Sequence, residues 1–299
     1  MEPILERLKK GEIIVGDGAL GTMLFQRGLE SGQCPELLNV TKPEVVEEIA
    51  RLYIEAGAQI ITTNTFGASP VKLANYLLEN RTEEINMVAV SIVKNAASIA
   101  SRSGVYISGS CGPSGKILKP YGDADPGELY AGFLRQMKVL LDERADIICI
   151  ETMTDIQEAI LAVKASKSLS TTRPVIATMT FDETPRGFYT IMGVSIRDAC
   201  ENLQKAGADI IGSNCGNGVE KMIKVAREFK RFSSLPLIIQ SNAGLPEIKD
   251  GKLFYSETPE FFADKTKELI EAGVSIIGGC CGTTPDHIRA IRKTVDSIR

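Results

Sequence analysis

A short pattern that recurs four times along the chain restricts the possible folds more than any other feature. It reads EAGAQIITTNTF at 55–66, ERADIICIET at 143–152, KAGADIIGSNC at 205–215 and EAGVSIIGGCC at 271–281. Each copy starts at the end of an amphipathic helix and continues into a β-branched apolar segment that finishes on small or polar residues. Gly57, Gly207 and Gly273 suit the left-handed turn that ends a helix. The continuous apolar segments predict strands buried on both faces, as in a parallel sheet covered by helices.

The same template, applied to the whole chain, predicts eight strands. They cover residues 12–18, 59–64, 105–110, 146–151, 174–181, 209–214, 236–243 and 275–280. Helices are expected between them, at 43–56, 82–102, 127–142, 155–168, 195–206, 218–231 and 258–272. Strands and helices that alternate in this way over 299 residues predict an α/β fold, a single (β/α)8 (TIM) barrel. We expect one domain over residues 1–299.

A doubly wound open sheet is the alternative fold. It is less favoured because the turn after the first strand reads GDGALGT at 16–22, which lacks the glycine spacing of a dinucleotide-binding turn.

Composition and charge indicate which binding partners and which cellular compartment to expect. The net charge of −4 gives no electrostatic support for nucleic-acid binding. No apolar run reaches the roughly 18 residues that span a bilayer, so no membrane segment is expected. The N-terminus lacks the apolar centre of a secretory signal, and the seven cysteines are an odd number. Reduced thiols in the cytoplasm are therefore expected, rather than a disulfide framework.

The ends of the predicted strands should carry the chemistry, because catalytic residues of (β/α)8 barrels lie at the C-terminal ends of their strands. Read in order, these positions are Asp17, Asn64, Ser110, Glu151, Thr180, Asn214 with Cys215, Asn242, and Cys280 with Cys281. Asparagine and serine at strand ends also cap helices and turns, which is the structural alternative for several of them.

The thiols are the sharpest signal among these residues. Cys215 ends the sixth predicted strand, and Cys280 and Cys281 end the eighth. Strands two places apart are only roughly 10 Å apart, a gap that zinc–sulfur bonds of about 2.3 Å can bridge. Gly278, Gly279 and Gly282 are expected to let the chain leave strand geometry, so that both neighbouring thiols can face one ion.

Three thiolates would leave one tetrahedral position open, as in a catalytic zinc site. With a net charge of −1, such a site is a poor activator of water and is better suited to keeping an incoming thiol deprotonated. Thiol alkylation is therefore the predicted reaction class. Asp17 and Glu151 stand where an ammonium group could be held, and the backbone N–H groups of GDGALGT could bind a carboxylate or a phosphate.

Other interpretations of these residues stay open. Cysteine is commonly a buried small hydrophobe, which fits Cys149 and Cys200. Cys34 is expected in a loop, and Cys111, at a strand end, could compete as a metal ligand. GGCCGTT could instead cradle a phosphate, and a vicinal disulfide is a third possibility. His287 is expected at the surface or as a helix cap.

Several motifs together resemble the homocysteine S-methyltransferase family. They are DGALGTML (17–24), TNTF (63–66), GP (112–113), ET (151–152), NC (214–215) and GGCCGTTPDHI (278–288), and the similarity runs from about residue 10 to the C-terminus. The family includes the N-terminal barrel of cobalamin-dependent methionine synthase and enzymes that use betaine or S-methylmethionine. The resemblance implies a (β/α)8 barrel with zinc on Cys215, Cys280 and Cys281, and homocysteine sulfur as the fourth ligand.

The resemblance also implies how the substrate would bind. The amino group of homocysteine would contact Asp17 and Glu151, and its carboxylate would meet the turn around Gly18 and Ala19. Asn64 is included among the expected substrate contacts.

The expected reaction is methyl transfer to homocysteine, giving methionine. The methyl group would come from a methyl-corrinoid or methyltetrahydrofolate system, with methylcobalamin carried by a separate corrinoid protein or module, because the chain lacks an Asp-x-His-x-x-Gly corrinoid signature. Direct use of betaine or S-methylmethionine, and a non-catalytic corrinoid-docking module, are the alternatives. A phosphate-binding lyase or aldolase is disfavoured, because no predicted strand end carries a Schiff-base lysine.

Overall fold

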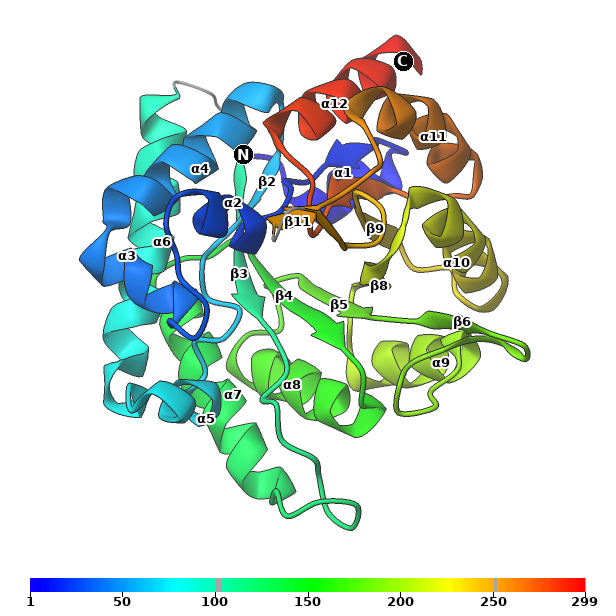
Figure 1. Ribbon diagram of the computed structural model, residues 1–299. Coiled ribbons are helices and arrows are strands. Elements are labelled where there is room, and N and C mark those ends of the chain that lie inside the picture. The colour runs from blue at the N-terminus through cyan, green and yellow to red at the C-terminus, as the bar shows by residue number, and fades with distance from the viewer. Residues whose placement is uncertain (101–103, 250–251, 299) are drawn as a thin grey trace.

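Eight parallel strands form a barrel in the computed structural model, which describes residues 1–100, 104–249 and 252–298 (Figure 1). In chain order the barrel strands are β1 (Ile14–Val15), β2 (Ile60–Thr62), β3 (Tyr106–Cys111), β4 (Ile147–Met153), β5 (Val175–Met179), β8 (Ile210–Gly218), β9 (Leu237–Asn242) and β12 (Ile276–Gly279). They pair in the order β1-β12-β9-β8-β5-β4-β3-β2, and a parallel bridge between Gly16 and Ile60 closes the ring. The predicted (β/α)8 barrel is confirmed, and the open-sheet alternative is wrong.

Helices surround the barrel, as the alternating pattern predicts (Figure 1). They are α4 (Pro43–Ala56), α6 (Thr82–Ile99), α7 (Pro126–Asp142), α8 (Ile156–Leu169), α9 (Ile196–Ala206), α10 (Val219–Phe232), α11 (Pro259–Glu271) and α12 (Pro285–Ile298). The helix predicted at 82–102 ends at Ile99, and residues 101–102 of that prediction lie outside the described residues. The strand predicted at 12–18 is shorter than expected, since β1 ends at Val15.

The recurring pattern that predicted the barrel has the expected local geometry. Gly57 and Gly207 follow α4 and α9 with φ of +108° and +109°, and Gly273 lies between α11 and β12 with φ of +86°. These are left-handed conformations that a side chain disfavours, so glycine turns the chain from helix into strand at a low steric cost.

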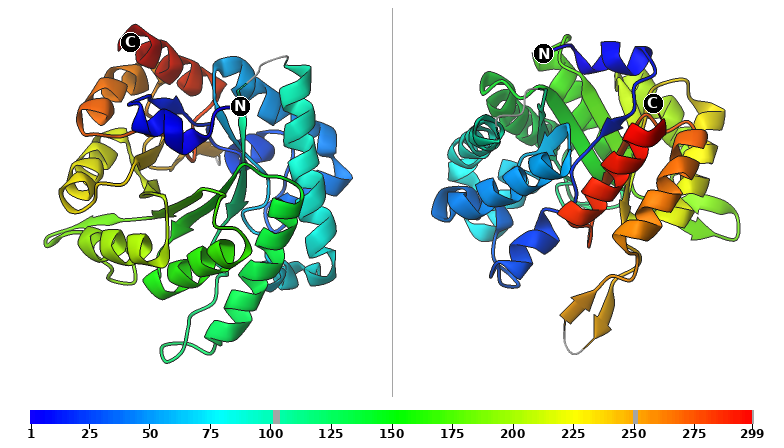
Figure 2. Two further views of the ribbon diagram at one scale, coloured as in Figure 1. Left: turned by 180° about the vertical axis from the view of Figure 1, so that it is seen from behind. Right: turned by 90° about the horizontal axis from the view of Figure 1, so that it is seen from above.

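Side chains fill one end of the barrel interior. A buried layer joins an inward-facing residue of every barrel strand, and most of these residues are isoleucines, such as Ile14, Ile176 and Ile276. Helix α1 (Ile4–Lys9) packs Ile4 and Leu8 against this layer. Figure 2 (right) shows α1 covering one end of the barrel, with the hairpin of β10 (Glu247–Lys249) and β11 (Lys252–Phe254) at the other. This apolar layer fills the barrel interior beside α1, so a site inside the barrel is expected at the C-terminal end of the strands.

Several short elements were not predicted from the sequence. They are α1, the helices α2 (Gly21–Gln26), α3 (Leu38–Thr41) and α5 (Pro70–Leu73), and the short helices η1 (Pro35–Leu37), η2 (Ala74–Tyr76) and η3 (Glu79–Arg81). Two hairpins follow barrel strands, β6 (Asp182–Thr184) with β7 (Gly187–Tyr189), and β10 with β11. With the exception of α1, these elements belong to the connections that follow strands, and therefore build the rim of the barrel.

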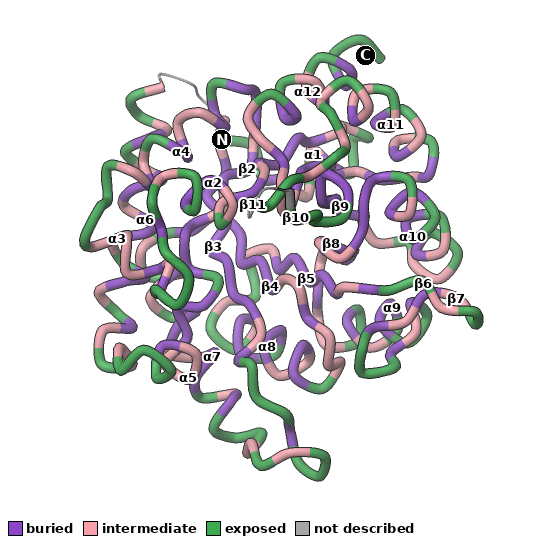
Figure 3. The backbone as a smooth tube through the Cα atoms, viewed as in Figure 1, coloured by how far each residue is buried: buried purple, intermediate pink, exposed green. Residues whose placement is uncertain are grey.

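Burial follows this layered arrangement. In Figure 3 the barrel strands are mainly buried, while exposed positions lie on the outer helices and connecting segments. None of the described helices combines the length and apolar character needed to cross a bilayer. The single domain over residues 1–299 stays a prediction.

Candidate active site

The three thiols singled out by the sequence converge in the structure. Cys215 lies within β8, Cys280 and Cys281 directly follow β12, and β9 lies between these two strands. The three sulfur atoms all lie within 4.8 Å of one another, and Cys215 Sγ is 3.9 Å from Cys281 Sγ. All three residues are partly exposed, so the cluster is accessible from the cavity that it borders.

Local backbone geometry turns these thiols toward one another. Cys215 has φ of +62° and Gly216 has φ of +75°, at a register shift between β8 and β9. A left-handed cysteine is unusual and is held here by its surroundings. After Cys281 the chain turns at Gly282, which has φ of +81°.

The expectation for the glycines around Cys280 needs a correction. Of the three, only Gly282 takes a left-handed backbone angle. Gly278 and Gly279 provide room instead of conformational freedom, since a Cβ at Gly279 would lie 2.2 Å from Thr283 Oγ1 and one at Gly278 would lie 2.9 Å from the Asp17 carbonyl oxygen.

The spacing of the sulfurs fits a single tetrahedral metal ion. Two ligands with metal–sulfur bonds of about 2.3 Å at a tetrahedral angle are roughly 3.8 Å apart, close to the 3.9 Å between Cys215 and Cys281. Hydrogen bonds from the Cys280 and Cys281 thiols lower the pKa of Cys215, and the contacts of Cys280 with Cys215 and Cys281 raise the pKa of Cys280. The cluster therefore already favours one thiolate.

An amide from β9 adjoins the sulfur cluster. The Asn242 side chain hydrogen-bonds the Cys215 sulfur, which helps to lower the pKa of that thiol. Asn242 Oδ1 is buried and has no hydrogen-bond partner among the described residues. An unpaired buried acceptor beside thiols is an environment that a cation would satisfy.

A cavity of about 290 Å³ connects the thiols with the predicted substrate contacts. Its lining includes the three cysteines together with Asp17, Gly18, Ala19, Asn64 and Glu151. The structure thus brings the predicted metal ligands and substrate contacts to one cavity, whereas the strand-end residues Thr180, Asn214 and Asn242 do not line it. Their ligands and roles remain proposals.

Two carboxylates, the buried Asp17 and the partly buried Glu151, line this cavity. Asp17 accepts hydrogen bonds from Thr62, at 2.6 Å from the backbone N–H and 3.1 Å from the hydroxyl. Glu151 accepts one from the Ser110 hydroxyl at 2.5 Å. Burial raises the pKa of each carboxyl to about 7, with these hydrogen bonds opposing the rise. A cationic group that entered the cavity would favour the ionised carboxylates.

Asn214 joins one carboxylate to the thiol cluster. Its Nδ2 donates to Glu151 Oε2 at 3.3 Å and to Thr152 Oγ1 at 2.8 Å. Its Oδ1 accepts from the Thr152 N–H at 2.9 Å and from the Thr178 hydroxyl at 2.7 Å. Thr152 has φ of +61°, so two left-handed residues, Thr152 and Cys215, flank this one amide.

Three of the residues predicted to contact the substrate already make close contacts within the protein. The Ala19 N–H donates to Thr283 Oγ1 at 3.0 Å. A Cβ at Gly18 would lie 2.8 Å from that same oxygen, so glycine is needed for this close approach. Asn64 Nδ2 donates to the Pro35 carbonyl at 2.8 Å and to Asn39 Oδ1 at 3.0 Å, so the Asn64 side chain also anchors η1 and α3.

The remaining cysteines lie outside the cluster. Cys149 and Cys200 are buried, as expected, and Cys34 is buried beside Glu36 at the start of η1. Cys111 ends β3, where it contacts Gln136 Oε1 at 3.3 Å. Among the described residues, the one group that could hold a metal ion contains only Cys215, Cys280 and Cys281, so Cys111 is not a competing ligand.

His287 is not a surface residue, contrary to one of the two expectations for it. It is buried at the start of α12, where Nδ1 accepts a hydrogen bond from the Thr284 N–H at 3.1 Å. Its Nε2 donates to the Glu257 carbonyl at 2.9 Å. The capping expectation is confirmed. Surface exposure is excluded because the ring packs edge-on against Phe262.

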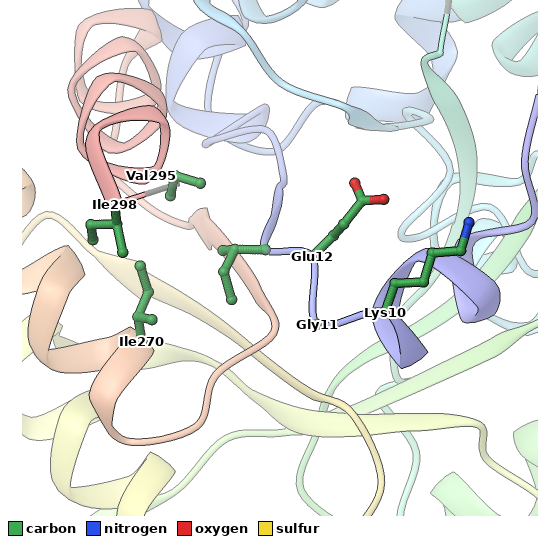
Figure 4. A pocket seen from close by; sticks show the side chains of 7 residues that line it. Lys10, Gly11, Glu12, Ile270, Val295 and Ile298 are labelled. Atoms are coloured by element: carbon green, nitrogen blue, oxygen red, sulfur yellow. The ribbon is translucent and has the colours of Figure 1, made fainter.

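A second cavity lies away from the candidate site. It has a volume of about 600 Å³ and is lined by Lys10, Gly11, Glu12, Ile13, Ile270, Val295 and Ile298 (Figure 4). These residues come from the segment after α1 and from α11 and α12, and none of them lines the thiol cavity.

Some residues that complete the site had been given no individual role, although Phe66 and Thr152 lie in the TNTF and ET motifs. Thr62, Thr152, Phe66 and Gln240 also line the thiol cavity. Gln240 could have been found, because Gln240 and Asn242 alternate along one predicted strand and therefore share a face. The role of Thr152 could not have been predicted from the sequence, since it depends on a tertiary contact with Asn214.

Comparison with known proteins assigns the family. The family described as homocysteine S-methyltransferase matches residues 14–295. Methionine synthase of Mycobacterium tuberculosis is 33% identical over 302 residues, which cover 96% of this chain and 25% of that protein. Its counterpart from Mycobacterium leprae is 33% identical over 307 residues, covering 98% of this chain and 25% of that protein. The chain therefore spans about a quarter of the length of these curated relatives.

Solved structures of other proteins have the same fold as this chain. The homocysteine methyltransferase MmuM from Escherichia coli, in its metallated form, superposes with a TM-score of 0.81 at 24% identity, covering 98% of this chain and 99% of that chain. Its oxidised form gives a TM-score of 0.76 at 25% identity, with coverage of 96% and 97%. The fold and the family match together place this protein in the homocysteine S-methyltransferase family, a family of methyltransferase enzymes.

Proposed function

We propose that this protein catalyses zinc-dependent transfer of a methyl group to the thiol of homocysteine, giving methionine. The observation that carries the proposal is the convergence of Cys215, Cys280 and Cys281 within 4.8 Å beside a cavity that the carboxylates of Asp17 and Glu151 also line. Zinc would be held by these three sulfurs, and when bound it would supply the positive charge that keeps an incoming thiol deprotonated.

The chain's own residues would select and orient the substrate. Asp17 and Glu151 would receive the ammonium group, and the turn around Gly18 and Ala19 would face the carboxylate. The hydrogen bond from Asn214 to Glu151 would fix that carboxylate relative to Cys215. Because the sulfurs and the carboxylates line one cavity, an amino acid with a thiol could reach both.

We further propose that the methyl group arrives through a methyl-corrinoid or methyltetrahydrofolate system, on a separate protein or module. The similarity to methionine synthases, which are about four times as long as the aligned region, supports this route. Direct use of a small donor such as betaine or S-methylmethionine is the second candidate. The observation that favours it is the similarity to a solved homocysteine methyltransferase, which is 25% identical and of which 97% is covered by the match.

Metal analysis tests the zinc proposal. We expect about one zinc per chain in the purified protein, and less after Cys215→Ser, Cys280→Ser or Cys281→Ser. Cys111→Ser is the matched control, because Cys111 also ends a barrel strand but lies outside the cluster. A fully active protein without metal would overturn the proposal.

A donor assay tests the reaction. The protein is mixed with homocysteine and, separately, with methylcobalamin, betaine or S-methylmethionine, and methionine is measured. Methionine from methylcobalamin but not from betaine or S-methylmethionine supports the corrinoid route, and the opposite pattern supports the small-donor candidate. Absence of methionine with every donor would support a docking module without turnover.

A further inference from the structure

Gln240 places a polar side chain in the barrel interior beside the candidate site. Strand β9 alternates, and Ile238 belongs to the buried interior layer, so Gln240 and Asn242 follow on the same face. In the sheet, Gln240 is in register with Asn214 on β8 and with Gly278 on β12. It therefore lies one layer above the buried interior layer, on the floor of the cavity that it lines.

Glycines on the neighbouring strands make room for this long side chain. A Cβ at Gly278 would come within 3.2 Å of Gln240 Cγ and 3.4 Å of its Nε2. A Cβ at Gly16 would come within 4.0 Å of the same Nε2. The amide is thus packed against backbone on that side, which restricts the directions in which it can point.

Gln240 Oε1 is buried and has no hydrogen-bond partner among the described residues. The whole residue is only 9% exposed. A buried acceptor without a partner is unfavourable, and such a group in a native protein is commonly satisfied by a ligand or an ordered water. Since Gln240 lines the same cavity as Asp17 and Glu151, a ligand that binds the two carboxylates can also reach this amide.

Two other buried oxygens on β9 lack partners among the described residues, and neither has the same role. Ser241 Oγ alternates to the outer face of the strand and does not line the cavity. Asn242 belongs to the sulfur cluster through its contact with Cys215. Gln240 is therefore the acceptor of this strand that is available to the polar part of a substrate.

We propose that Gln240 is a third binding residue for the ammonium group of the substrate, and that it makes the site select α-amino thiols over simple thiols. An ammonium group has three N–H donors, and Asp17, Glu151 and Gln240 would supply one acceptor each. The third acceptor is neutral, so it completes the shell without adding another negative charge to a buried site. This inference rests on the proposed function, because it assumes an amino-acid thiol as the substrate.

The test compares homocysteine with 4-sulfanylbutanoate, which is homocysteine without its amino group. Binding to the zinc-loaded protein is measured by calorimetry for the wild type and for Gln240→Leu. We expect the leucine variant to bind homocysteine about tenfold more weakly or worse, and to bind 4-sulfanylbutanoate as the wild type does. Gln240→Glu keeps the acceptor and the length, and should retain the preference for homocysteine.

Ser241→Ala is the matched control, since it removes a neighbouring buried hydroxyl that faces away from the cavity. It should leave both affinities unchanged. If Gln240→Leu does not fold, Gln240→Asn withdraws the amide by one methylene and should show the same selective loss. If Gln240→Leu weakened the binding of both ligands equally, or of neither, the role of Gln240 would be overturned and the proposed function would stand. A zinc-loaded wild type that binds neither thiol would overturn the proposed function as well.

Discussion

Asn214 Nδ2 donates a hydrogen bond to Glu151 Oε2 across 3.3 Å, and the next residue in the chain is Cys215. One buried amide therefore connects a carboxylate on β4 with a thiol of the cluster. Its Oδ1 also holds Thr152 and Thr178, so each polar atom of this amide has a partner. The relationship predicts that substrate contacts and metal ligands are coupled through Asn214.

Replacing Asn214 by alanine should weaken both functions together. The change leaves the Thr152 N–H and the Thr178 hydroxyl without their acceptor, which costs roughly 1–3 kcal/mol of the free energy of unfolding per buried group. Zinc content and homocysteine affinity should both fall. Asn86→Ala is the control, because Asn86 is also a buried asparagine that hydrogen-bonds backbone carbonyls, away from the cavity. It should lower the free energy of unfolding and leave zinc content unchanged.

Gly282→Ala should disrupt the thiol cluster. Alanine at this position would have to keep φ of +81° while its Cβ lay 2.1 Å from the Tyr255 ring, and a left-handed non-glycine residue alone costs roughly 1–3 kcal/mol. Gly193→Ala isolates that backbone cost, since Gly193 has φ of +80° and a Cβ added there would meet no described atom within 4 Å. Zinc analysis should show a loss for Gly282→Ala only. Equal zinc content in both variants would refute the steric explanation.

The carboxyl groups of Asp17 and Glu151 should make the metal-free protein less stable as the pH rises. Each folded-state pKa is about 7, above the ordinary value, so the folded state keeps protons that the unfolded chain releases. This stabilisation is complete below about pH 4 and is lost as the pH rises to about 7, with an upper bound of roughly 4 kcal/mol per group. Urea unfolding at pH 5 and pH 8 measures the difference, which should shrink in Asp17→Asn. An unchanged difference in that variant would contradict the assignment to Asp17.

Removal of zinc should lower the thermal stability of the loaded protein. A ligand that binds only the folded state, at a free concentration 100 times its Kd, adds about 2.7 kcal/mol to the free energy of unfolding. A chelator should therefore lower the Tm of the wild type. Cys215→Ser should show little change on the same treatment. A wild-type Tm that does not respond to the chelator would argue against zinc at the cluster.

Much of the fold could be predicted from local patterns. The helix, glycine and apolar strand of each recurring unit are adjacent in sequence. The conformation of residues such as Gly207 and Ile210 can therefore be predicted from their immediate neighbours. The short rim elements could not be predicted in this way. The β10–β11 hairpin and α2 lie in connections, where loop length and packing against the barrel decide the conformation.

Patterns in the amino-acid sequence predicted the barrel, the adjacent thiols Cys280 and Cys281 at one strand end, and Cys215 on a strand two places away, although that strand continues beyond Cys215 to Gly218. Three features became visible only in three dimensions: the left-handed backbone angle of Cys215, the link from Asn214 to Glu151, and the buried, unpartnered oxygen of Gln240. The difference arises because periodicity fixes which face of an element is buried. The direction of a polar side chain inside the barrel depends instead on which neighbouring strands leave it space and hydrogen-bond partners.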